Sequence, residues 1–173
     1  MDKEKALDFL RRHQPLPDDK TLNETPNLIK EYNEVRQYFE AHPDKQAIPL
    51  LLNSFGDGSG FGLYQLVEDA IIPFPAEEVV PHLVQVLSSK YQGVRYWAAQ
   101  VAMSFPSPQL LQPLQKILQE DNSDGRTAAA SSLAFIQGEG VDEILRQALN
   151  SEQDNDIREF ITQVLEDRGS RAE

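Results

Sequence analysis

The sequence predicts an all-α protein, a right-handed α-solenoid of about four helix pairs with an N-terminal helical cap. Two recurring features predict it. Helices rich in small residues open with an arginine, and these arginines lie 31 and 32 residues apart, at Arg95, Arg126 and Arg158. Prolines recur every 32 residues in the preceding apolar segments, at Pro49, Pro81 and Pro113. A fixed period of roughly 20 to 50 residues is typical of stacked repeat proteins.

Residues 1–43 are expected to form the cap from two helices. The first covers residues 3–13, and a proline and acid cluster at residues 15–19 must be irregular. The second starts with Thr25 as its capping residue and Pro26 in its first turn, where a missing N–H is tolerated. Its apolar positions share one helical face, at Leu28, Tyr32, Val35 and Phe39. This pair would close the exposed end of the stack.

Four helix pairs are then expected over residues 44–75, 76–106, 107–138 and 139–168, with residues 169–173 as a disordered tail of one compact domain. The shared phase of the three prolines suggests a helix kink that belongs to the repeat. The second helices begin near Gly62, Gly93, Gly125 and Asp156. Tyr64 stands where the later pairs have arginine, and such departures are common in end repeats.

The recurring motif is a proline-bearing apolar helix, an Asp or Gly turn, and then Val-Arg-x-x-Ala-Ala, as in residues 94–99. It resembles HEAT repeats, especially the short HEAT-like repeats of the phycobilin-lyase type, over residues 44–168. The resemblance implies that the motif residues build the stack. It also implies that Arg95, Arg126 and Arg158 are structural and brace the turns through acidic neighbours.

Composition narrows the function classes. The chain has no cysteine, which excludes disulfides and thiolate sites, and its formal net charge is −12. A field of this sign disfavours direct nucleic-acid binding and attracts basic partners, although an acidic surface also serves solubility. No apolar run approaches the roughly 20 residues of a membrane span, and the first residues lack a secretory signal. We expect a cytoplasmic protein without membrane partners, a monomer rather than a homo-oligomer.

Motifs that carry chemistry are incomplete. No histidine belongs to a His-Glu-x-x-His pair, and residues 56–62 are rich in glycine but lack the Gly-Lys-Ser/Thr of a phosphate-binding loop. Residues 120–125 resemble the start of a calcium loop, but Ser131 stands where a bidentate Glu is required. We therefore expect no cofactor, no metal and no catalytic residue. The glycine-rich turn stays a candidate partner-contact loop.

A partner surface is expected on the inner side of the second helices. With Val94, Ala98, Val101 and Phe105 as core, steps of 100° place Tyr96, Gln100 and Met103 on the opposite face. Trp97 lies at the flank, either as a core filler or as an interface anchor. Aligning the other second helices gives the predicted ridge, which consists of Gln65, Asp69, Tyr96, Trp97, Gln100, Met103, Ser131, Glu159, Gln163 and Glu166.

Two functions remain open from the sequence. The first is a non-catalytic protein-binding module, an acidic inhibitor that resembles HEAT-like immunity proteins and captures a basic partner, such as a toxin nuclease, on its concave face. The second is an adaptor, a chaperone-like or lyase-type subunit that works in complex with an enzyme, since the repeats resemble those of phycobilin lyases. No single residue distinguishes them.

Overall fold

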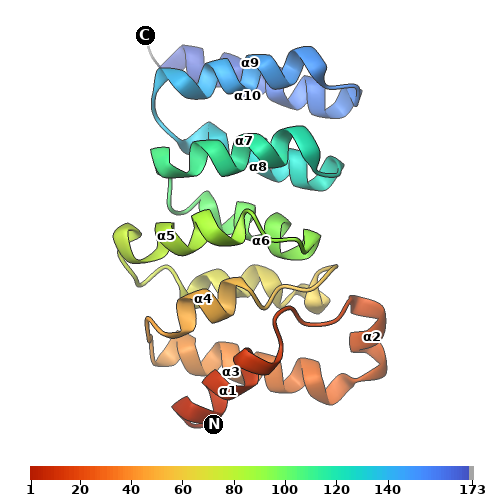
Figure 1. Cartoon of the computed structure of the whole chain (residues 1–173), viewed down its shortest axis with the longest axis vertical. Helices are drawn as coiled ribbons and strands as arrows, with labels where there is room; N and C mark the ends of the chain where they lie inside the picture. Colours follow the sequence, from red (N-terminus) through yellow and green to blue (C-terminus); the bar gives the residue numbers. More distant parts are fainter. Residues whose placement is uncertain (172–173) are drawn as a thin grey trace.

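The predicted all-α solenoid is confirmed by the computed structural model, which describes residues 1–171. The helices stack in pairs along one long axis, with the N-terminus at one end and the C-terminus at the other (Figure 1). Four pairs follow the cap. The first consists of α4 (Ala47–Leu52) with η1 (Gly60–Gly62) and η2 (Tyr64–Ala70), and the second of α5 (Ala76–Val86) with α6 (Gln92–Ala102). The third consists of η3 (Pro108–Leu110) and α7 (Leu111–Glu120) with α8 (Ser123–Phe135), and the fourth of α9 (Glu139–Ser151) with α10 (Asn155–Arg171).

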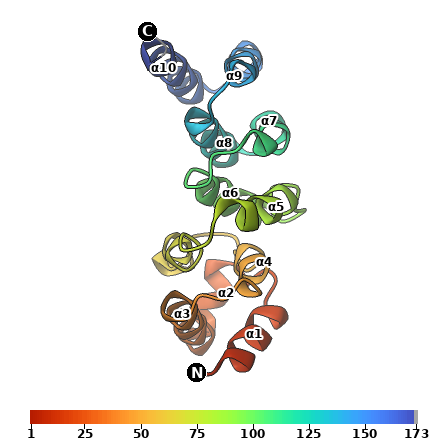
Figure 2. The same ribbon diagram turned by 90° about the vertical axis from the view of Figure 1, so that its left-hand side faces the viewer.

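First and second helices occupy opposite sides of the stack. In Figure 2 the second helices α6, α8 and α10 lie on one side with the cap helix α3, and the first helices α4, α5, α7 and α9 lie on the other. Both ends of the stack lean toward the second helices. The second helices therefore line the concave side, and the first helices form the convex side.

The N-terminal segment contains one helix more than expected. Besides α1 (Lys3–Arg12) and α3 (Pro26–Ala41), residues Asp19–Glu24 form the short helix α2, which buries Leu22. Asp18 caps it by accepting a hydrogen bond from the Thr21 N–H at 2.8 Å. Thr25 is the N-cap residue of α3 and Pro26 lies in its first turn, as predicted, but the Thr25 hydroxyl makes no capping hydrogen bond and donates to the Thr21 carbonyl instead. Helix α1 packs on α4 and α3 packs on η2, as a repeat would.

The three recurring prolines do not share one position in their helices. Pro49 and Pro113 are the third residues of α4 and α7, within the first turn, where an N–H has no helical acceptor to lose. Only Pro81 lies well inside its helix, α5. The prediction of a kink common to all three repeats is therefore wrong, because the helices start at different distances from the proline.

The first and last repeats depart from the regular pattern. The second helix of the first pair, η2, is a 3₁₀ helix, and it follows a turn in which Gly60, Phe61 and Gly62 all have positive φ. Pro73 disfavours a helical conformation at the preceding residue and so limits further extension. At the other end α10 continues through Arg171, so residues 169–171 are helical rather than part of the expected disordered tail. Residues 172–173 of that tail lie outside the described residues.

The core runs through the whole stack. The predicted core positions Val94, Ala98, Val101 and Phe105 are all buried. Small residues fill the contact between α6 and α8, including Ala99 and the run at residues 128–130, and they allow the two backbones to approach closely. The buried Ser132 hydroxyl donates a hydrogen bond to the Ala99 carbonyl across this contact. The motif alanines are thus packing residues.

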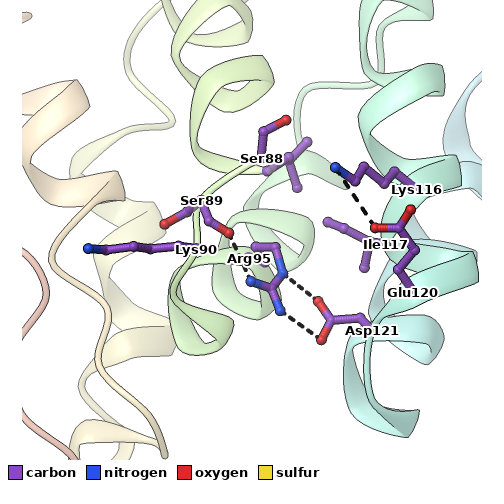
Figure 3. Close-up of a pocket in the computed structure, with 9 residues that line it drawn as sticks. Ser88, Ser89, Lys90, Arg95, Lys116, Ile117, Glu120 and Asp121 are labelled. Carbon is purple, nitrogen blue, oxygen red and sulfur yellow. Dashed lines mark hydrogen bonds and ion pairs between the residues drawn. The ribbon is translucent and has the colours of Figure 1, made fainter.

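Arginine clamps join successive repeats. Arg95 donates from Nε and Nη2 to the two carboxylate oxygens of Asp121 at 2.6 and 3.0 Å, and from Nη1 to the Ser89 carbonyl at 2.8 Å (Figure 3). Arg126 repeats this geometry one pair later, with Glu152 at 2.7 and 3.0 Å. Arg158 donates from Nη1 to the carbonyls of Leu149 and Glu152. The bracing of turns by acidic neighbours is therefore confirmed for Arg95 and Arg126.

The interface between the first two repeats uses different contacts. Tyr64 replaces the arginine, and Lys90 stands 26 residues after it, the spacing at which Asp121 and Glu152 follow their arginines. The glycine-rich turn at residues 56–62 joins the repeats instead. The Asp57 carboxylate accepts the Gly93 N–H at 2.9 Å, and a Cβ on Gly93 would lie 2.1 Å from the Gly56 carbonyl oxygen. Close backbone approach therefore substitutes for the clamp.

The Arg126–Glu152 clamp should contribute stability that depends on pH. Burial alone would raise the pKa of Glu152, but hydrogen bonds from Arg126 and from the N–H groups of Asp154 and Gln153 hold this pKa below its usual 4.5. A lowered carboxyl pKa stabilises the folded state fully above the unfolded value. This stabilisation disappears as pH falls through the folded-state pKa.

Glu152→Gln is therefore expected to lower the free energy of unfolding by about 1–2 kcal/mol at pH 7, and this loss should shrink as the pH falls from 7 through the folded-state pKa of Glu152. Urea unfolding across this pH range measures the difference. Glu120→Gln is the matched control, because its partner Lys116 is 3.8 Å away and both side chains are 64% exposed. A loss for Glu152→Gln that is equally large in acid would contradict the assignment.

The close approach at the first interface makes a second prediction. Gly93→Ala should lower the free energy of unfolding by about 2 kcal/mol or more, because the new methyl group would overlap backbone rather than a flexible side chain. Gly140 is also the second residue of its helix, but a methyl group added there would have nothing within 4 Å. Gly140→Ala should therefore stabilise by about 0.5–1 kcal/mol, the usual helix preference. Thermal unfolding of both variants tests the contrast, and equal effects would refute it.

Candidate partner-binding surface

The predicted ridge lies on the concave side, but its ten residues form three sets. Gln65 and Asp69 are exposed on η2, and Glu159, Gln163 and Glu166 are exposed on α10. The middle set is half-buried and comprises Tyr96, Trp97 and Gln100 on α6, Met103 directly after it, and Ser131 on α8. The aromatic centre is thus less exposed than the acidic ends.

Trp97 is both packed and partly exposed. Its indole ring stacks on Phe55 with the centroids 6.0 Å apart and meets Tyr64 edge-on at 5.8 Å. The indole N–H donates to the Gly58 carbonyl at 2.9 Å. Tyr96 meets the other side of Trp97 at 5.1 Å and 82°. Trp97 therefore fills the edge of the core and also presents part of its ring, beside Tyr96, at the surface.

Two polar residues of the ridge form hydrogen bonds within their own helices. Gln163 donates to the Asp167 carboxylate one turn further along α10, and the Ser131 hydroxyl donates to the Thr127 carbonyl of its own helix. Tyr96 and Trp97 are brought into contact, whereas the α10 residues belong to the C-terminal repeat. The ridge is a set of positions along one side rather than one continuous patch.

An open depression of about 600 Å³ borders the aromatic pair, where the glycine-rich turn meets the first turns of α6 and α8. It is lined by Asp19, Asp57, Gly58, Ser59, Gln92, Gly93, Tyr96, Trp97, Asn122 and Asp124. We call it the aromatic-acidic depression. Three aspartates line it, and none of these ten residues is a lysine or arginine.

Asp19 shapes this depression from a distant part of the chain. Its carboxylate accepts the N–H groups of Ser59 and Gly60 at 2.9 and 2.8 Å, and its own N–H donates to the Asp57 carbonyl. Neither Asp19 nor the nearby Asp57 and Asp124 was among the predicted site residues. Asp57 and Asp124 lie in turns that the sequence already marked. Asp19 belongs to the proline and acid cluster at residues 15–19, but the sequence did not indicate its partner, because its contact with the turn spans 40 residues.

Beneath the turn, Tyr64 replaces the arginine of the later repeats with a buried ring. Burial is the main cause that raises the pKa of Tyr64 to about 12, with smaller contributions from the nearby carboxylates of Asp19 and Asp57. The phenol is therefore neutral at pH 7. It acts as packing under the aromatic pair.

A second hollow of about 300 Å³ lies between the second and third repeats (Figure 3). Arg95 and Asp121 point toward each other across it, and Lys116 points toward Glu120. These charges already pair with one another, so we assign this hollow to the arginine clamp rather than to a ligand.

In the described part of the chain no three His, Cys, Asp or Glu side chains are grouped to hold a metal ion. Within the same residues no helix has the length and apolar character needed to cross a membrane.

Comparison with known proteins agrees with the geometry. The family model of HEAT repeats matches residues 80–166, which span α5 to α10 and include Arg95, Arg126 and Arg158. A search of curated proteins finds no match. The match covers half of the chain, and the paired helices, packed alanines and turn-bracing arginines are those of such repeats. This chain belongs to the HEAT-repeat family.

Proposed function

We propose that this protein is a non-catalytic binding module, an acidic inhibitor of the immunity-protein type that captures a basic partner protein, such as a toxin nuclease, on its concave side. HEAT repeats form helical scaffolds for protein binding, and this supports the general class. The finer assignment to an inhibitor is our inference from charge and surface.

One observation carries the proposal. The ridge contains three carboxylates, Asp69, Glu159 and Glu166, and no basic residue. Among the arginines of these helices whose side chains the structure describes, Arg95, Arg126 and Arg168 pair with acids, and Arg158 donates to backbone carbonyls. The charges of Arg95, Arg126 and Arg168 are therefore largely neutralised internally. The side that a solenoid offers to a partner keeps an excess of negative charge, which speeds encounter with a cationic protein.

The alternative function is an adaptor, a chaperone-like or lyase-type subunit bound to an enzyme. It differs from the inhibitor in its dependence on charge. Electrostatic capture weakens with added salt, whereas an adaptor that docks through apolar contacts holds its partner at high ionic strength. Pull-down of the tagged protein from its own cell extract at low and high salt, with the neighbouring gene products identified by mass spectrometry, separates the two.

Adding positive charge to the ridge should weaken capture of a basic partner. We expect Gln100→Lys with Gln163→Lys to weaken binding at least about tenfold, because two cations would face a cationic protein across the interface. Titration calorimetry with the captured partner measures the change. Circular dichroism confirms that the fold is retained.

The matched control places the same substitutions on the convex side, as Gln85→Lys with Gln119→Lys. Both residues are exposed on first helices, α5 and α7, and the net charge changes equally. Binding should be nearly unchanged in this control. If both double variants lost the same affinity, only overall charge would matter, and the concave side would not be the binding surface.

A further inference from the structure

The aromatic-acidic depression combines two features that favour the same ligand. On one side Tyr96 and Trp97 present half-buried rings, and an aromatic face attracts a cation through its quadrupole. On the other sides Asp19, Asp57 and Asp124 contribute three negative charges. The Trp97 ring is fixed by packing on Phe55 and Tyr64, and Tyr96 packs on Trp97 in turn, so little ordering is required when a ligand arrives.

The two helix starts at this depression are not open to an anion. Helix N-termini usually attract negative groups through their unpaired N–H donors. Here the Gly93 N–H of α6 already donates to Asp57, and the Gly125 N–H of α8 already donates to Asn122. What faces the open volume is therefore carboxylate, amide and aromatic surface.

The carboxylates of Asp19 and Asp57 hold the glycine-rich turn in place and can still accept hydrogen bonds from a ligand. Each carboxylate binds backbone N–H groups of this region, which holds its oxygens in place. Asp124 is different, because it is exposed in the first turn of α8 and makes none of these bonds to the turn. Its charge can therefore be removed without disturbing the loop.

We propose that this depression is the anchor site for an arginine side chain of the basic partner. The inference rests on the proposed function and assigns one contact within it. A guanidinium is planar, stacks on aromatic rings and donates in several directions at once, which matches two rings beside three carboxylates. The volume of about 600 Å³ accommodates such a side chain with neighbouring backbone.

The chain supplies its own reporter for this site. Trp97 is the only tryptophan and lines the depression, so its fluorescence reports occupancy there. The probe is a blocked pentapeptide, Gly-Gly-Arg-Gly-Gly, titrated at low ionic strength against the same peptide with citrulline, the neutral isostere of arginine. We expect a saturating change in Trp97 emission with the arginine peptide only.

Two variants locate the effect. Asp124→Asn should weaken binding of the arginine peptide about threefold, the size of a single exposed charge contact. Asp156→Asn changes the equivalent first-turn aspartate of α10, outside the depression, and should leave the affinity unchanged. Equal responses to arginine and citrulline, or equal losses in both variants, would overturn the proposal.

Failure of this inference can be told apart from failure of the proposed function. If the arginine peptide binds as described but no basic protein is captured, the anchor site stands and the inhibitor function falls. If a basic partner is captured and binds Asp124→Asn and Tyr96→Leu as tightly as the wild type, the anchor site is overturned and the inhibitor function stands.

Discussion

The bidentate arginine clamp is the interaction on which the regular part of this molecule depends. Arg95 and Arg126 each bind the two oxygens of an acid 26 residues ahead, and in each case Nη1 holds a carbonyl of the arginine's own turn. The acids are nearly buried, with 4% and 6% of their side chains exposed. One side chain thus fixes the turn within a repeat and the distance to the next, and the small residues of α6 and α8 can then pack closely.

The first interface shows what the same stack requires when the clamp is absent. Tyr64 stands at the position of the arginine and Lys90 at the position of the acid, so both partners of the ion pair are replaced together. The glycine-rich turn, Asp57 and Trp97 provide backbone contact and hydrogen bonds in place of charge. The aromatic-acidic depression lies at this boundary. The most distinctive surface of the protein therefore coincides with the place where its repeat pattern changes.

Periodicity in the sequence was sufficient to predict the solenoid, its second helices and their buried positions, because Val94, Ala98 and Val101 recur with the helix period. The structural role of Arg95 and Arg126 was predicted from the resemblance to HEAT repeats. The proline kink was wrong because sequence phase does not fix where a helix starts. Helix α2 and the role of Asp19 were missed because they depend on a contact across 40 residues, which no local pattern encodes. The predicted ridge remains a prediction about binding.

The direction of the clamps has a consequence for how the chain assembles during synthesis. Arg95 and Arg126 each precede their acid by 26 residues. The guanidinium of a newly made repeat therefore has no carboxylate partner until the next turn has left the ribosome. The later repeat completes the earlier one. The first interface follows the same order, because the Asp57 carboxylate is made before the Gly93 N–H that it accepts. The repeats are therefore locked one at a time, from the N-terminus toward the C-terminus.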